Sequence, residues 1–227
     1  MVKAEVLFFG TPDFGESEEY QEFQFKFLCV VLFTGGLFTS LFLFGELTGL
    51  NRIKSPHLYS MSLFTVVALI LWAFLRGHKQ RFTSIAWLYE AICLIEYTSA
   101  LAYVPSDELR ILWFFVNVPG VYILLGQRAG LCITAATLVG LTLGNRYLSA
   151  PYSQNAMATA IVSLTYLGVF FHVYGNRSIS YFIRLRESSQ QLRHMAMHDT
   201  LTGVMNARAY YGNCDHLISL AHRKNSP

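Results

Sequence analysis

Long apolar stretches, each about as long as a bilayer is thick, constrain this chain more than any other feature of its sequence. A helix needs about 20 mostly apolar residues to cross the hydrocarbon core, because its backbone polar groups must be bonded within the helix. Six stretches approach or exceed that length; they cover residues 25–44, 58–75, 82–104, 109–125, 129–148 and 156–174. We therefore expect an all-α fold, with a six-span transmembrane domain at residues 25–174.

Composition and charge support a membrane protein. Hydrophobic residues make up 53% of the chain and charged residues 14%, whereas about 25% charged is typical of soluble domains. A formal net charge of +3 does not point to nucleic acid, because Lys and Arg gather between the apolar runs and after the last one. The expected partner is therefore the lipid bilayer, and no nucleic acid is expected.

The distribution of Lys and Arg also predicts the orientation. Six spans place both termini on the same side of the membrane. Residues 1–24 stay attached on that side, because the residues after their short apolar run are too acidic for a signal peptide. That side receives nine basic residues and the other side four: Lys3, Lys26, Arg76, Lys79, Arg81, Arg128, Arg177, Arg184 and Arg186 against Arg52, Lys54, Arg110 and Arg146. By the positive-inside rule both termini are cytoplasmic, and residues 1–24 form a cytoplasmic or interfacial segment.

Two carboxyl groups, Glu90 and Glu96, lie within the third predicted span. Ionisable groups at membrane depth are costly, so each needs a reason. Their spacing places them about 120° apart around a helix, so they do not form a paired carboxylate site. Glu90 shares a face with Tyr97, and Glu96 shares one with Tyr89. The functional interpretation is a ligand, proton or ion site between helices; the structural one is a carboxyl bonded to Tyr or Ser of a neighbouring helix.

Two further polar residues are candidates for a sensor or ligand site. Asn117 lies near Pro119 in the fourth span, where a kink beside a buried amide suits a ligand pocket or ordinary helix packing. His172 shares a face of the sixth span with Gly168 and Gly175. One interpretation is that this face leaves room for a planar cofactor, with the imidazole as a haem ligand. The alternative is that His172 is an interfacial residue bonded to a backbone carbonyl or a lipid headgroup. The sequence does not identify a metal.

Residues 175–198 have heptad spacing after the last span. The apolar seam steps by three and four residues through Phe182, Leu185, Ser189, Leu192 and Ala196. Such spacing is typical of a coiled coil, and the small Ser189 and Ala196 make a weak seam that could shift register. We expect a dimeric signalling helix here; a single amphipathic helix is the alternative.

A short polar motif follows this helix. Asp199 and Thr200 end the helix, Gly203 permits a sharp turn, and Asn206 is a good N-cap for the next helix. The residues Asp199, Leu201, Thr202, Gly203, Asn206 and Arg208 resemble the D-x-L-T-G-L-x-N-x-R motif at the start of the GGDEF domain of diguanylate cyclases, with Val204 replacing the usual Leu.

The resemblance implies a bacterial inner-membrane sensor that regulates a cyclase. Such an enzyme makes cyclic di-GMP from two GTP molecules with Mg²⁺, and two catalytic domains must meet in a homodimer. Residues 199–227 would be the start of an α/β GGDEF domain that is truncated before its catalytic strands, so this chain is expected to be inactive. An unknown small molecule would be the stimulus. The alternatives are a transporter or channel, and a haem-binding membrane protein with a helical tail.

Overall fold

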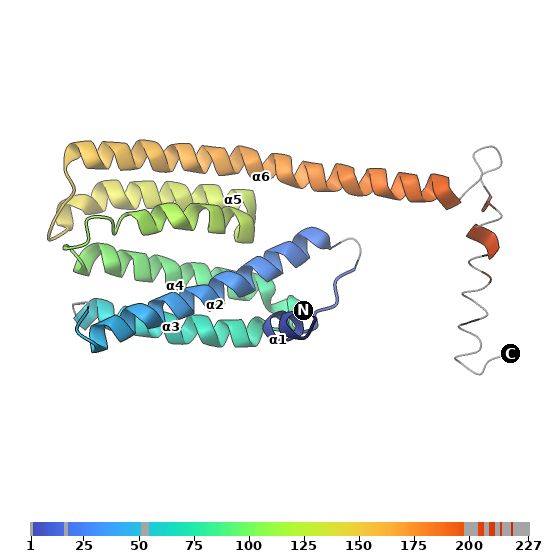
Figure 1. Cartoon of the computed structure of the whole chain (residues 1–227). Coiled ribbons are helices and arrows are strands. Elements are labelled where there is room, and N and C mark those ends of the chain that lie inside the picture. The colour runs from blue at the N-terminus through green and yellow to red at the C-terminus, as the bar shows by residue number, and fades with distance from the viewer. Residues whose placement is uncertain are drawn as a thin grey trace. The chain divides into compact units, whose positions relative to one another are not determined.

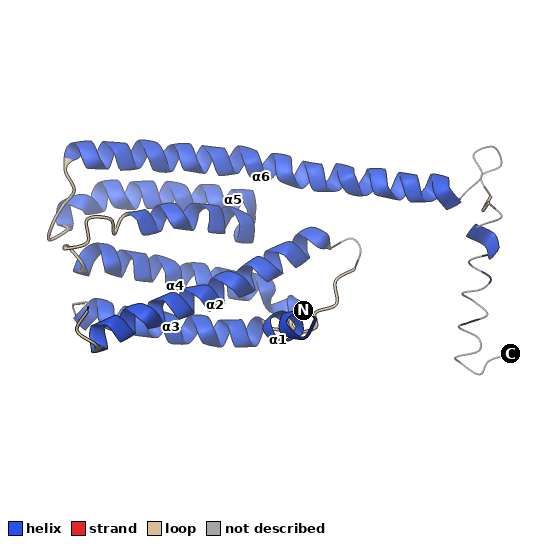
Figure 2. Ribbon diagram, in the orientation of Figure 1, coloured by secondary structure: helices blue, strands red, loops and turns tan. Residues whose placement is uncertain are grey.

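The computed structural model describes the chain except for residues 1, 16–17, 51–54, 198–203, 207–208, 212–213, 215–218 and 220–227. Its elements are α1 (Val2–Phe9), α2 (Glu19–Leu47), α3 (Ser55–Leu75), the 3₁₀ turn η1 (Lys79–Arg81), α4 (Phe82–Tyr103), α5 (Leu112–Gly144), the 3₁₀ turn η2 (Asn145–Tyr147) and α6 (Gln154–Met197). The described residues contain helices, turns and loops but no strand element (Figure 2). The expected all-α fold is confirmed for this part of the chain.

Among the residues that the structure describes, five helices are long and apolar enough to cross a bilayer: α2, α3, α4 with η1, α5 with η2, and the first half of α6. This confirms the expectation of a membrane protein. Because the predicted fourth and fifth spans both fall within α5, the count of six stays a prediction.

The helix α5 breaks at Gly126, where the sequence predicts a turn between two spans. Gly126 has φ 83° and ψ −178°, a backbone conformation that is essentially restricted to glycine. Phe114 and Leu141 nevertheless belong to one core cluster, although a straight helix would hold them roughly 40 Å apart. The chain therefore reverses at Gly126, and the two parts of α5 lie alongside one another (Figure 1).

The helices α2 to α5 pack in chain order, α2 on α3, α3 on α4 and α4 on α5. Successive helices run in opposite directions, so the bundle has two ends. The Gly126 end comprises Glu19, Leu75, Phe82 and Gly126, and the Arg110 end comprises Leu47, Ser55, Tyr103 and Arg110. A small residue lets α2 and α3 approach closely, because a methyl group at Gly36 would lie 2.9 Å from the Leu69 side chain.

The described part of residues 1–24, predicted to be a cytoplasmic or interfacial segment, packs at the Gly126 end of the bundle. The amide of Gly77 donates to Phe9 O at 3.0 Å, and a methyl group at Gly10 would lie 2.6 Å from the Gly77 nitrogen. The Phe8 ring meets those of Phe33 and Trp72. The start of α2 at Glu19, six residues before the predicted span, follows from acidic side chains favouring a helix N-terminus.

The chain divides into two compact units, Met1–Asn176 and Arg177–Pro227. The boundary falls within α6, and the helix continues to Met197. In the second unit Leu185, Ser189, Leu192 and Ala196 of the predicted seam are exposed, and the Phe182 side chain lies outside the described residues. The dimeric coil stays a prediction.

Candidate functional site

A carboxyl–amide pair links α4 to α5 in the interior of the bundle. Asn117 Nδ2 donates to Glu90 Oε1 at 2.7 Å, and Glu90 is only 5% exposed. The partner is therefore an amide rather than the Tyr or Ser of the structural alternative. A lone carboxyl at this depth would lose its hydration with nothing to replace it. The hydrogen bond from the Asn117 amide offsets part of the desolvation cost of burying Glu90.

A second polar group, at the Arg110 end, links α3 to α4 around His57. Its Nδ1 lies 3.2 Å from Ser99 Oγ, 3.4 Å from Ser60 Oγ and 3.6 Å from Glu96 Oε1. Ser60 donates to Ser99 at 2.7 Å. His57 and Glu96 are both buried, and Glu96 Oε2 has no hydrogen-bond partner among the described residues. The four side chains form one buried polar group in which the imidazole and the carboxyl group lie next to each other.

Glu90 and Glu96 thus contact different helices, in keeping with their spacing on α4. The two tyrosines named with them make ring contacts instead. Tyr89 packs against Phe64, and Tyr97 stacks on Trp113 with ring centroids 6.0 Å apart. The structure therefore does not gather the predicted sensor residues into one site.

The glycine face around His172 is filled by side chains of α5. A methyl group at Gly168 would lie 3.0 Å from Thr134 Cγ2, and one at Gly175 would overlap the amide of Gln127. The ring of Tyr122 lies against His172 with centroids 6.2 Å apart. The room expected there for a planar cofactor is occupied, so these residues do not fit haem.

A buried arginine joins two loops at the Arg110 end. Arg110 is 3% exposed, and it donates to the carbonyls of Leu101 (Nε, 3.1 Å), Asp107 (Nη1, 2.7 Å) and Ala150 (Nη2, 2.7 Å). Its guanidinium also lies 4.7 Å from the centre of the Tyr152 ring. From the sequence, Arg110 is only a basic residue at the start of the predicted span 109–125, because carbonyl acceptors leave no pattern of residue types.

At the opposite end, the break at Gly126 is bonded to α2 and packed against α6. Carbonyls in the last turn before a break lack their helical amide donors. The carbonyl of Ile123 is one of these, and it accepts a hydrogen bond from Gln24 Nε2 of α2 at 2.5 Å. Immediately after the break, Gln127 packs against Gly175 of α6. Three helices therefore meet around one glycine, which the sequence marks only as a turn.

Within the second unit, Asn206 of the cyclase-like motif is an N-cap as predicted. Its Oδ1 accepts from the amide of Ala209 at 2.9 Å. Its Nδ2 donates to Ala196 O at 2.7 Å and its backbone amide to Met197 O at 2.9 Å. Asn206 thus bonds the last turn of α6 to the segment that follows. The other motif residues, Asp199, Leu201, Thr202, Gly203 and Arg208, lie outside the described residues.

The described residues contain no group of three or more His, Cys, Asp or Glu side chains that could hold a metal ion. Comparison with known proteins adds no assignment: no family model matches the chain, and no curated protein or solved structure is significantly similar to it.

Proposed function

We propose that the chain is the membrane sensory part of a diguanylate cyclase of the bacterial inner membrane. In this proposal each part of α5 crosses the bilayer separately, which gives six spans and two cytoplasmic termini. The bundle responds to a small molecule, and a homodimer of the helix after residue 175 carries the response to GGDEF domains beyond this chain. Those domains would convert two GTP into cyclic di-GMP with Mg²⁺.

The observation that carries the proposal is the helix α6. Its apolar first half packs on α5, it is helical from Gln154 to Met197, and the motif residue Asn206 is bonded to its last turn. In this proposal a change in the rotation of α6 reaches the next domain through the bonds of Asn206 to its last turn. Phosphoryl transfer depends on positioning, so the geometry of the dimer is sufficient to control it.

A pair of insertions after Gln191 tests this route in a protein that carries the proposed cyclase domain. Four added residues turn everything that follows by about 40° and shift the heptad seam, whereas seven restore it. We expect the four-residue insertion to change cyclic di-GMP output severalfold and the seven-residue insertion to leave it near the original level. Equal output from both would contradict the proposal, and purified Met1–Pro227 should make no cyclic di-GMP.

Ion or proton transport is the second candidate, favoured by the buried carboxyls of Glu90 and Glu96. Intramembrane ionisable residues often mark proton or ion pathways. Liposomes containing the chain would then show a flux that Glu96→Gln abolishes. Absence of flux for H⁺, Na⁺ and K⁺ excludes transport of these ions and leaves the sensor.

A further inference from the structure

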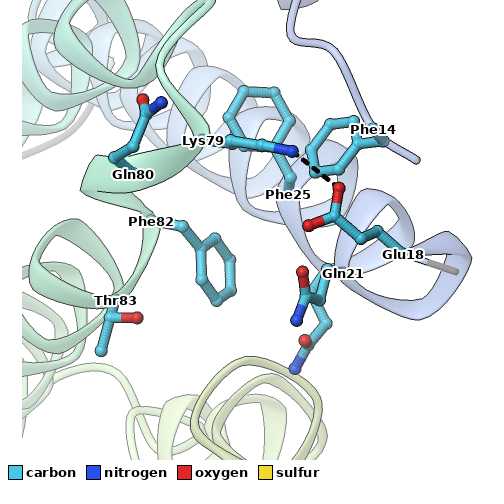
Figure 3. Close-up of a pocket in the computed structure, with 9 residues that line it drawn as sticks. Phe14, Glu18, Gln21, Phe25, Lys79, Gln80, Phe82 and Thr83 are labelled. Atoms are coloured by element: carbon cyan, nitrogen blue, oxygen red, sulfur yellow. Dashed lines mark hydrogen bonds and ion pairs between the residues drawn. The ribbon is translucent and has the colours of Figure 1, made fainter.

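A cavity of about 430 Å³ opens at the Gly126 end of the bundle (Figure 3). The start of α2, the turn η1 and the start of α4 form its walls. Nine residues line it: Phe14, Glu18, Gln21, Gln24, Phe25, Lys79, Gln80, Phe82 and Thr83. This volume is in the range that holds small ligands.

The charges of the cavity cancel. Lys79 Nζ lies 2.6 Å from a carboxylate oxygen of Glu18, and that oxygen also accepts from the amide of Gly15 at 2.9 Å. Glu18 and Lys79 are the two charged residues of the lining. Because each neutralises the other, the cavity offers no unpaired charge to an ionic ligand.

Unused polar groups remain beside aromatic rings. Among the described residues, the amide of Gln21 and the hydroxyl of Thr83 have no protein partner, and Gln24 donates to Ile123 O while its Oε1 stays available. In Figure 3 the ring of Phe82 projects toward Gln21. A primary amide offers a donor and an acceptor side by side, which matches the edge of a heterocycle, and aromatic side chains favour stacking with planar rings.

We infer that this cavity binds an uncharged, planar heteroaromatic molecule with hydrogen-bonding edges. The ring of Phe82 would contact one of its faces, and Gln21, Gln24 and Thr83 would bond its edge. This ligand class would be the stimulus of the proposed sensor, and that regulatory role rests on the proposed function.

The position of Gln24 connects the cavity to α6. Gln24 lines the cavity and donates to Ile123 O next to the break at Gly126. Gln127, on the other side of the break, packs against Gly175 of α6. A ligand that draws the Gln24 side chain away would leave the Ile123 carbonyl without this donor and would bias the break that contacts α6.

Binding of lumichrome, a fluorescent and uncharged three-ring heterocycle, tests the site. The chain is placed in phosphatidylcholine nanodiscs, and the fluorescence anisotropy of lumichrome is titrated against empty nanodiscs as background. A drug-sized ligand in such a site should bind with a Kd of roughly 100 μM. Absence of saturable binding would overturn the inference.

Three variants locate the binding. Gln21→Trp fills the cavity and should weaken binding more than about tenfold, and Gln21→Leu removes only the amide and should weaken it severalfold. Gln154→Trp places the same ring on an exposed residue at the Arg110 end and should have no effect. Circular dichroism verifies that each variant is folded. If Gln21→Trp does not fold, Thr83→Trp blocks the same cavity from α4. Binding that survives both blocking variants would also overturn the inference.

This assay does not depend on a cyclase. Failure to bind lumichrome would remove the ligand site and leave the insertion experiment to decide the proposed function. Unchanged cyclic di-GMP output in that experiment would equally leave the ligand site in place.

Discussion

Removing the donor of the Glu90–Asn117 pair should destabilise the bundle measurably. Asn117→Leu keeps a side chain of similar size but leaves Glu90 Oε1 without its 2.7 Å hydrogen bond at a position that is 5% exposed. An unsatisfied buried polar group costs about 1–3 kcal/mol. Measured interhelical hydrogen bonds in membranes are weaker, about 0.6 kcal/mol on average and about 1.7 at most. We therefore expect a loss of about 1–2 kcal/mol in the free energy of unfolding.

A double-mutant cycle separates the pair from its surroundings. Glu90→Leu, Asn117→Leu and the double variant are unfolded in micelles by increasing fractions of SDS, with helix content as the signal. The double variant removes both polar groups, so its loss should be smaller than the sum of the two single losses by about 0.5–1.5 kcal/mol. Glu90→Gln keeps the acceptor and should lose under about 1 kcal/mol, and Asn155→Leu, at an exposed position, is the control. Additive losses would refute the reasoning.

Three other perturbations probe other parts of the bundle. Gly126→Ala forces a side chain into φ 83° and should lower the free energy of unfolding by about 1–3 kcal/mol, seen as a lower thermal midpoint. Gly140→Ala is the control: no atom lies within 4 Å of the added methyl, so the thermal midpoint should stay unchanged or rise. Arg110→Lys replaces the three bonded nitrogens of the guanidinium by a single one, which cannot reach all three carbonyls. The variant should lose about 2 kcal/mol or more in the free energy of unfolding, read as a lower Tm. Hydrogen bonds from Lys79 and from the Gly15 amide lower the pKa of Glu18 below its ordinary 4.5. The stability that this pair contributes is therefore present above about pH 4.5 and lost as pH falls through the lower folded value, and Lys79→Met should raise the pKa of Glu18 in a carboxyl NMR titration.

Hydrophobic length was the most informative property of the sequence, because span length follows from bilayer thickness. The gap between the predicted spans 109–125 and 129–148 is the place where Gly126 breaks α5, since glycine and polar residues interrupt two apolar runs there. The N-cap role of Asn206 was also predicted and is confirmed by its bond to Ala209, because a cap depends only on local sequence.

Contacts between helices were less predictable, because they depend on how each helix is rotated toward its neighbours. Asn117 and Glu90 were both named, but their pairing was not. The predicted span 58–75 leaves His57 just outside it, although His57 forms the centre of the group with Glu96. The glycines beside His172 suggested free space, which Tyr122, Thr134 and Gln127 fill, since a sequence does not show which large side chain faces a small one.

The continuity of α6 across Asn176 is the claim on which the proposed signalling route depends most. Spin labels at Val173 and Gln191, both exposed, lie on one face of the helix. Pulsed electron paramagnetic resonance in nanodiscs, with labelled protein diluted in unlabelled protein, measures the distance between them. A continuous helix predicts a single narrow distribution near about 27 Å between the two backbone positions, broadened only by the label linkers. A broad distribution that reaches much shorter distances would indicate a hinge and would contradict the account.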